Sequence, residues 1–266
     1  NFYDTVRDVV MGRKPAIELT HIWRRTEGLV PNMLYFLENH DEQRIASGFY
    51  CGRGTCAEPA MIVAATLGTN PVMIYAGQEL GEKGMDSEGY SGMDGRTTIF
   101  DYWGIRSIQA WANEGKFDGK GLDEEQNELR SFYKKLLNIA RQNKAITVGK
   151  MYDLVYAQSQ DFNKHEQYAY IRKSGEQILL MVLNFDDKQV DVSITIPQEA
   201  FDCLSMYAWD RVTAFDMLSE RWLNTNGEFQ ETMNEKTMIC FTPNTPIKMH
   251  LPAWKGVILR IENKLF

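Results

Sequence analysis

The chain has 266 residues, of which 44% are hydrophobic and 24% are charged, a balance typical of a globular protein with a sizeable core. Its 29 basic and 36 acidic residues give a net charge of −7, which argues against nucleic-acid binding through a clustered basic surface. No apolar run approaches the roughly 20 residues of a membrane-spanning helix, so we expect no membrane partner. The chain begins at Asn1 without a signal-like segment. We therefore expect a piece of a longer protein, whose location the sequence leaves open.

The four cysteines are too few and too scattered for a disulfide framework, and none belongs to the CxxC spacing of a zinc site. Cys51 and Cys56 could bridge a short loop, but we favour unpaired thiols for both. No combination of residues resembles a metal site, so we expect no metal and no cofactor in this chain.

Helical and short apolar segments alternate along the first third of the chain. Residues 1–12 and 16–27 each place apolar side chains on one helical face and end at or near a glycine. Residues 33–37, MLYFL, are too short for a helix and indicate a buried strand. A helix with small apolar residues then begins at Glu58, and a second short strand follows at 72–75. This order predicts a βαβ unit with its two strands parallel.

A long glycine-rich loop runs from Gly77 to Thr98, and loops of that length are usually functional or disordered. We favour an ordered, functional loop, because its last part and the residues just after it include Asp94, Arg96, Asp101, Tyr102 and Trp103. We interpret Asp101, Tyr102 and Trp103 as packing and capping residues of the next helix. The clearest helix starts at about residue 123, where a capping Asp precedes a regular 3.6-residue apolar period.

From about residue 146 the apolar period changes from 3.6 to 2, and turn signals such as Asn226-Gly227 separate the segments. Many short strands with no helix between them predict an antiparallel β-sandwich. We therefore expect an α/β domain over residues 1–145 followed by an all-β domain over residues 146–266. The expected strands lie near residues 151–157, 167–173, 177–184, 190–196, 207–215, 236–241, 247–251 and 257–261.

A dense polar cluster directly follows the first predicted strand, where residues 38–44 read ENHDEQR. A buried strand that ends in closely spaced carboxylates, an imidazole and amides is the pattern of an α/β active-site rim. A charged surface loop would give the same local pattern. The segment by itself does not decide between these two interpretations.

The run Phe36-Leu37-Glu38-Asn39-His40-Asp41 resembles the strand-seven motif of the α-amylase family of glycoside hydrolases. Residues 71–79, PVMIYAGQE, look like strand eight of the same family, and the intervening helix and the β-rich ending also fit. The resemblance covers essentially the whole chain but only the last part of the family's architecture. It implies a partial TIM (β/α)8 barrel, made of strands seven and eight with their helices, followed by an antiparallel β-sandwich.

The resemblance also implies roles for particular residues. The family cleaves α-glucosidic bonds with retention, using a nucleophile, an acid/base and a third carboxylate that stabilises the oxocarbenium-like transition state. Asp41 matches that third, catalytic carboxylate. His40, with Asn39, matches residues that bind the sugar beside the scissile bond. Asp94 and Arg96 resemble the pair with which many members bind the next glucose, and a structural ion pair is an equal alternative.

No segment before Met33 resembles the family's nucleophile or acid/base motifs. We therefore expect this chain alone to be inactive, while its intact parent acts on starch-like α-glucans or maltooligosaccharides. Calcium (Ca2+), common in the family, would bind in the missing part of the parent. The uncovered edges and face of an incomplete barrel also lead us to expect that the first part of the chain self-associates, rearranges or packs against the β-sandwich of the same chain.

Two other functions fit parts of the sequence. A non-catalytic carbohydrate-binding or assembly protein can keep an amylase-like scaffold. Alternatively, residues 146–266 could form a free-standing sugar-binding sandwich. We favour this less, because Trp209, Trp222 and Trp254 are better explained by packing than by an exposed aromatic platform. The sequence leaves open the linkage cleaved and the choice between hydrolysis and transfer.

Overall fold

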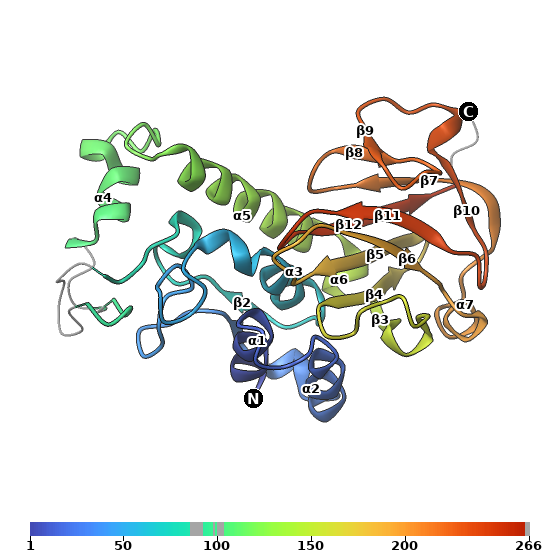
Figure 1. The fold of residues 1–266 in the computed structure, drawn as a ribbon, viewed down its shortest axis with the longest axis horizontal. Coiled ribbons are helices and arrows are strands. Elements are labelled where there is room, and N and C mark those ends of the chain that lie inside the picture. The colour runs from blue at the N-terminus through green and yellow to red at the C-terminus, as the bar shows by residue number, and fades with distance from the viewer. Residues whose placement is uncertain (86–92, 98, 100–103, 264–266) are drawn as a thin grey trace.

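The computed structural model describes residues 1–85, 93–97, 99 and 104–263, with helices prominent in the first part of the chain and antiparallel strands in the second (Figure 1). The predicted packing and capping role of Asp101, Tyr102 and Trp103 lies outside the described residues. Within these ranges, no helix has both the length and the apolar character needed to cross a membrane.

The helices largely follow the apolar periodicity of the sequence. The helix predicted from Asp123 has the expected capping box: Asp123 Oδ1 accepts a hydrogen bond from Gln126 N at 2.8 Å, and Gln126 Oε1 accepts one from Asp123 N at 3.1 Å. Of the described helices, α4, α6 and α7 were not predicted: α4 buries only Ser107, and α6 is only four residues long. The α-helices are α1 (Phe2–Val10), α2 (Glu18–Thr26), α3 (Glu58–Thr66), α4 (Arg106–Ala112), α5 (Glu124–Gln142), α6 (Lys144–Thr147) and α7 (Gln198–Leu204). Short 3₁₀ turns lie at Val30–Asn32, Gly54–Ala57, Gln78–Leu80, Asn113–Gly115, Val155–Ala157 and Glu235–Thr237.

The strands β1 (Tyr35–Phe36) and β2 (Val72–Met73) pair in parallel, which confirms the predicted βαβ unit, although both strands are shorter than expected. The connecting helix α3 packs against β1, α5 and β12, so nearly every residue in it is buried. That burial on all sides accounts for its small, apolar composition. Because β1 and β2 run in the same direction, the loops after them leave the sheet at the same edge.

The second part of the chain is built from antiparallel strands. The strands are β3 (Lys150–Asp153), β4 (Gln167–Ser174), β5 (Gln177–Asn184), β6 (Val190–Ile194), β7 (Trp209–Asp216), β8 (Arg221–Leu223), β9 (Phe229–Gln230), β10 (Met238–Phe241), β11 (Ile247–Leu251) and β12 (Gly256–Glu262). One sheet has the order β3-β4-β5-β12-β7-β8-β9, with β10 also paired to β7. The strands β6 and β11 form a separate antiparallel pair. The alternating apolar pattern therefore predicted the strand type correctly.

The β part differs from the prediction in several details, among them the short strands β8 and β9, which lie in none of the expected strand ranges. The strand expected over 151–157 ends at Asp153, because the carboxylate of Asp153 accepts the backbone N–H of Val155 at 2.9 Å and a 3₁₀ turn begins there. The expectation of no helix between strands is wrong at α7. Ala200, Phe201 and Leu204 in α7 recur at helical spacing and are buried, so a helix satisfies this segment better than a strand.

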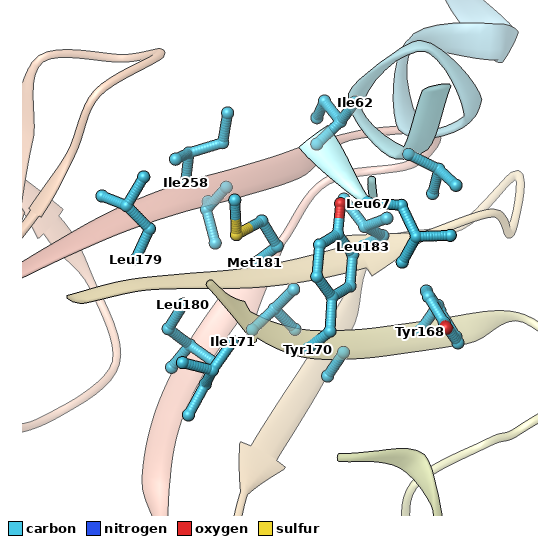
Figure 2. Packing of buried hydrophobic residues seen from close by; sticks show 14 of the residues in the cluster. Ile62, Leu67, Tyr168, Tyr170, Ile171, Leu179, Leu180, Met181, Leu183 and Ile258 are labelled. Carbon is cyan, nitrogen blue, oxygen red and sulfur yellow. The ribbon is translucent and has the colours of Figure 1, made fainter. Parts of the chain in front are cut away.

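The two parts share a single hydrophobic core. Ile62 and Leu67, from α3 and the residue after it, lie beside side chains of the β-sheet such as Tyr170 and Ile258 (Figure 2). A hydrogen bond of 2.6 Å between the hydroxyls of Thr66 and Tyr170 crosses the same contact. The predicted division after residue 145 stays a prediction, since the core runs continuously across it.

Polar side chains also join the two parts. The buried Arg172 of β4 donates hydrogen bonds of 2.6 to 2.9 Å to the carbonyl oxygens of Leu67, Ala145, Ile146 and Gly149. Burial lowers the pKa of Arg172 to about 10. Thr20 Oγ1 donates to Asp153 at 2.6 Å, and Lys255 Nζ reaches Glu58 Oε1 at 2.6 Å. These contacts hold the helical part against the sheet at three separate places.

The state of two of the four cysteines differs from the prediction. The structure pairs Cys51 with Cys56 in a disulfide, with a Cα–Cα distance of 6.5 Å, so the prediction of unpaired thiols is wrong for these two. Gly52 has a φ of +83° and lets the chain turn back on itself between them. Cys203 is a free, exposed thiol, and Cys240 is free and half-buried.

Candidate functional site

The polar cluster predicted after the first strand lies at the carboxyl end of β1, at the edge of the sheet where β2 also ends. Asn39 shapes this segment, because its side-chain oxygen accepts the backbone N–H groups of Asp41 at 2.8 Å and Glu42 at 2.9 Å. Such an Asx turn fixes the direction of the residues that follow. The oxygen of Asn39 is therefore engaged by the turn itself.

His40 and Asp41 project outward from this turn. Their side chains are 51% and 77% exposed, and His40 Nε2 lies 3.5 Å from Asp41 Oδ2. An exposed carboxylate beside an imidazole can meet a ligand directly. The turn thus presents the two side chains that the sequence singled out most strongly.

Asp94 and Arg96 reach the same place from the loop after β2. Arg96 Nη1 pairs with Asp94 Oδ2 at 2.9 Å, and Arg96 Nε donates to the backbone oxygen of Asp41 at 2.9 Å. Both side chains stay partly exposed, at 38% for Arg96 and 42% for Asp94. The structure therefore brings together all five residues proposed from sequence, and it contains the structural ion pair that was the alternative for Asp94 and Arg96.

A buried ion pair between Arg44 and Glu38 supports the polar cluster from the protein interior. Arg44 Nη1 donates to Glu38 Oε2 at 2.7 Å, and both side chains are almost completely buried. The same guanidinium donates to Ala76 O at 2.7 Å and through Nε to Thr97 Oγ1 at 2.9 Å. It also lies over the ring of Tyr75, 4.2 Å from the centroid. Arg44 thus ties the end of β1, the end of β2 and the Asp94 loop into one unit.

Glu38 is constrained in the same way. Its second oxygen accepts the backbone N–H of Ile45 at 2.6 Å. Burial raises the pKa of Glu38, while the Arg44 guanidinium opposes that rise. With both oxygens bonded inside the protein, Glu38 supports the turn instead of facing a ligand.

The helix α1 holds the far end of the polar cluster. Tyr3 donates its hydroxyl to Glu42 Oε2 at 3.0 Å, and Arg7 Nη2 donates to Gln43 at 2.6 Å. These contacts could not be predicted from the sequence, because Tyr3 and Arg7 lie some forty positions before Glu42 and Gln43 and belong to no recognisable motif. Their only signal was their place in a predicted amphipathic helix.

No metal centre accompanies this cluster in the part of the chain that the structure describes, where no three or more His, Cys, Asp or Glu side chains group to hold an ion.

The fold of this chain is similar to that of several solved structures. No protein-family model matches the sequence. Among solved structures, a noncanonic maltogenic α-amylase from Thermotoga neapolitana matches 99% of this chain with 15% identity and a TM-score of 0.60. An α-amylase from Geobacillus thermoleovorans, complexed with acarbose, matches 99% of it with 12% identity and a TM-score of 0.61.

A third structure, AmyP in complex with maltose, matches 97% of the chain with 16% identity and a TM-score of 0.59. The chain spans about half the length of each of these proteins, covering 50%, 47% and 48% of them. At such low identity the likeness concerns the fold. The predicted resemblance is confirmed at that level: over nearly its whole length, this chain has the fold of a part of the α-amylase structures.

Proposed function

We propose that the chain is part of a retaining glycoside hydrolase of the α-amylase type, made of the last two units of a (β/α)8 barrel and a C-terminal antiparallel β-sandwich. Its substrate is a starch-like α-glucan or maltooligosaccharide. One observation carries the proposal. The Asn39-His40-Asp41 turn at the end of β1 meets the Asp94 loop through the hydrogen bond of 2.9 Å between Arg96 Nε and Asp41 O. Similar structures hold acarbose and maltose, which supports an oligosaccharide ligand.

The chemistry assigned to Asp41 is electrostatic. Cleavage of a glycosidic bond develops positive charge on the anomeric carbon, and a fixed carboxylate lowers the energy of that transition state. His40 hydrogen-bonds a hydroxyl of the same sugar. Asp94, held by Arg96, accepts hydrogen bonds from the next glucose outward. The turn and the buried Arg44 keep these groups in place before the substrate arrives.

The chain alone is expected to be inactive. A retaining reaction needs a nucleophile and an acid/base whose carboxyl groups lie about 5–5.5 Å apart. Among the described residues near Asp41, Glu38 is buried against Arg44 and Glu42 is bonded to Tyr3. Each of these carboxylates already serves the scaffold, so neither supplies the missing pair.

The first experiment incubates the chain with maltopentaose and measures new reducing ends, with no product expected. The second places Asp41→Asn in the proposed parent polypeptide. We expect kcat to fall by about 10²–10³-fold or more, because a charge that acts only in the transition state is lost. Asp187→Asn, which removes an exposed carboxylate of the β part, is the matched control and leaves kcat unchanged.

The prediction that the chain alone is inactive is contradicted if the chain hydrolyses maltopentaose and the Asp41→Asn variant of the chain does not. A parent that binds maltopentaose but never cleaves it favours the alternative, a carbohydrate-binding protein on the same scaffold.

A further inference from the structure

A groove of about 570 Å³ lies between the helical part and the β part, on the side of α2 and β3. Its volume falls within the range of roughly 300–1,000 Å³ that is common for small-molecule sites. One wall comes from α2 and the turn after it, and the other from β3, the 3₁₀ turn Val155–Ala157 and α7. Figure 1 shows α2, β3 and α7 along the lower side of the molecule. The groove shares no residue with the Asp41 site.

Three large aromatic side chains line the groove: Trp23 from α2, Tyr152 from β3 and Tyr156 from the 3₁₀ turn. Tyr156 is 52% exposed, and Trp23 and Tyr152 are half-buried. The hydroxyls of Tyr152 and Tyr156 hydrogen-bond at 2.6 Å, and their ring centroids lie 6.2 Å apart. This bond holds the two rings next to each other in the groove lining, with their planes tilted by 52°.

Three charged side chains without partners also line it. Arg24, Glu27 and Lys150 form no side-chain hydrogen bond or ion pair with any residue that the structure describes. The groove thus offers hydrogen-bond donors from Arg24 and Lys150 and acceptors from Glu27, with both signs of charge present. Such a lining does not select a strongly charged ligand of either sign. It suits a neutral ligand that has many hydroxyls.

A sugar combines the two properties that the groove matches. The apolar C–H face of a pyranose ring packs on an aromatic side chain, and its hydroxyls need donors and acceptors around the edge. An apolar peptide would use the rings but would leave the three charged groups unpaired and partly desolvated.

We propose that this groove is a second carbohydrate-binding site, which holds a neutral oligosaccharide against Trp23, Tyr152 and Tyr156. Arg24, Glu27 and Lys150 bond its hydroxyls. The carbohydrate class follows from the groove itself, whereas the choice of an α-glucan rests on the proposed function. The site would hold a longer glucan at a point remote in sequence from Asp41.

The test uses the whole chain and titrates it with maltopentaose by calorimetry. Tyr156→Ala removes one exposed stacking ring and is expected to raise Kd about tenfold. Glu27→Gln changes an exposed acceptor without disturbing packing and is expected to raise Kd severalfold. Tyr207→Ala is the matched control, because Tyr207 is also an exposed tyrosine of the β part, 68% exposed, but does not line the groove. Its Kd should equal that of the unmodified chain.

A second readout locates the ligand. Cys203 lines the groove as a free and exposed thiol, so saturating maltopentaose should slow its alkylation by iodoacetamide. Cys240→Ser removes the other free thiol, which does not line the groove. Unchanged affinity for maltopentaose in both Tyr156→Ala and Glu27→Gln overturns the proposal of an α-glucan in this groove.

The two proposals fail in different ways. Binding that is lost with His40→Ala but not with Tyr156→Ala overturns the groove and leaves the Asp41 site standing. If cellopentaose protects Cys203 and maltopentaose does not, the groove is supported as a carbohydrate site, and the result counts against an α-glucan function. Protection by neither sugar overturns the groove.

Discussion

Replacement of Arg44 by methionine tests the idea that one buried guanidinium supports the whole candidate site. Methionine has a similar length and no charge. The change removes the ion pair of 2.7 Å to Glu38 and the hydrogen bonds to Ala76 O and Thr97 Oγ1. It leaves the Glu38 carboxylate buried without its partner.

The expected loss is large. Breaking a buried ion pair from one side typically costs about 3–5 kcal/mol, because the remaining charge stays desolvated. Each kcal/mol corresponds to roughly 2–4 °C in Tm for a chain of this size. We therefore expect the melting temperature of Arg44→Met to fall by roughly 6–20 °C at neutral pH. A surface arginine would cost about 1 kcal/mol or less.

The loss should depend on pH in a defined direction. Burial already raises the pKa of Glu38 above its unfolded value, and Arg44 limits that rise. A group whose folded pKa is the higher one binds more protons in the folded state, so its contribution to stability falls as the pH rises between the two pKa values. Without Arg44 the folded pKa of Glu38 rises further, so the pH range over which this stability is lost extends to higher pH. The variant should thus lose less stability at pH 5 than at pH 8.

The assay is urea unfolding followed by circular dichroism at both pH values, and the control is the double variant Arg44→Met with Glu38→Gln. The double variant should recover a good part of the loss, because no buried charge is left unpaired. A loss below about 1 kcal/mol for the single variant, or a double variant less stable than the single one, would refute the reasoning.

Three further predictions concern the rest of the chain. Arg172→Met removes three buried hydrogen bonds and one partly buried hydrogen bond to carbonyl oxygens, and should cost about 3 kcal/mol or more in urea unfolding, with Arg172→Lys intermediate; equal stabilities would contradict this. Burial raises the pKa of Glu58 and Lys255 opposes that rise, so Lys255→Met should destabilise the chain more at pH 8 than at pH 5, as thermal melts can show. Among the residues that the structure describes, β1 and β2 pair only with each other, so the outer edges of this sheet are open; light scattering should then show masses above 30.7 kDa as concentration increases, and a clean monomer throughout would contradict this.

Much of the secondary structure was encoded locally. The helix α5 has its capping box and its apolar period within the same twenty residues, so no distant contact was needed to predict it. The strand β11 alternates apolar and polar residues, and β12 has apolar residues at every second position from Val257 to Ile261; both were found at or within one residue of the predicted bounds. Where local signals were weak, as in α4, or competed, as in α7, prediction failed.

The candidate site was encoded only in part. The sequence placed Asn39, His40 and Asp41 directly after a strand, and parallel pairing then predicts which loop they face. It did not show that the side chain of Asn39 is engaged by the turn or that Arg44 is buried against Glu38. Whether a polar side chain faces solvent or the interior depends on partners elsewhere in the chain. The spacing of neighbouring residues in the sequence does not identify those partners.

The sequence by itself determined the order and type of most elements and the place of Asp41 directly after a strand, because periodicity, capping and turn preferences act over a few residues. The tertiary structure alone decided which side chains meet. Arg96 reaches the backbone of Asp41 across 55 positions, and Trp23 lines one groove with Tyr152 although 129 positions separate them. Such contacts form because apolar side chains from both parts of the chain are buried in one common core, which brings residues distant in sequence together.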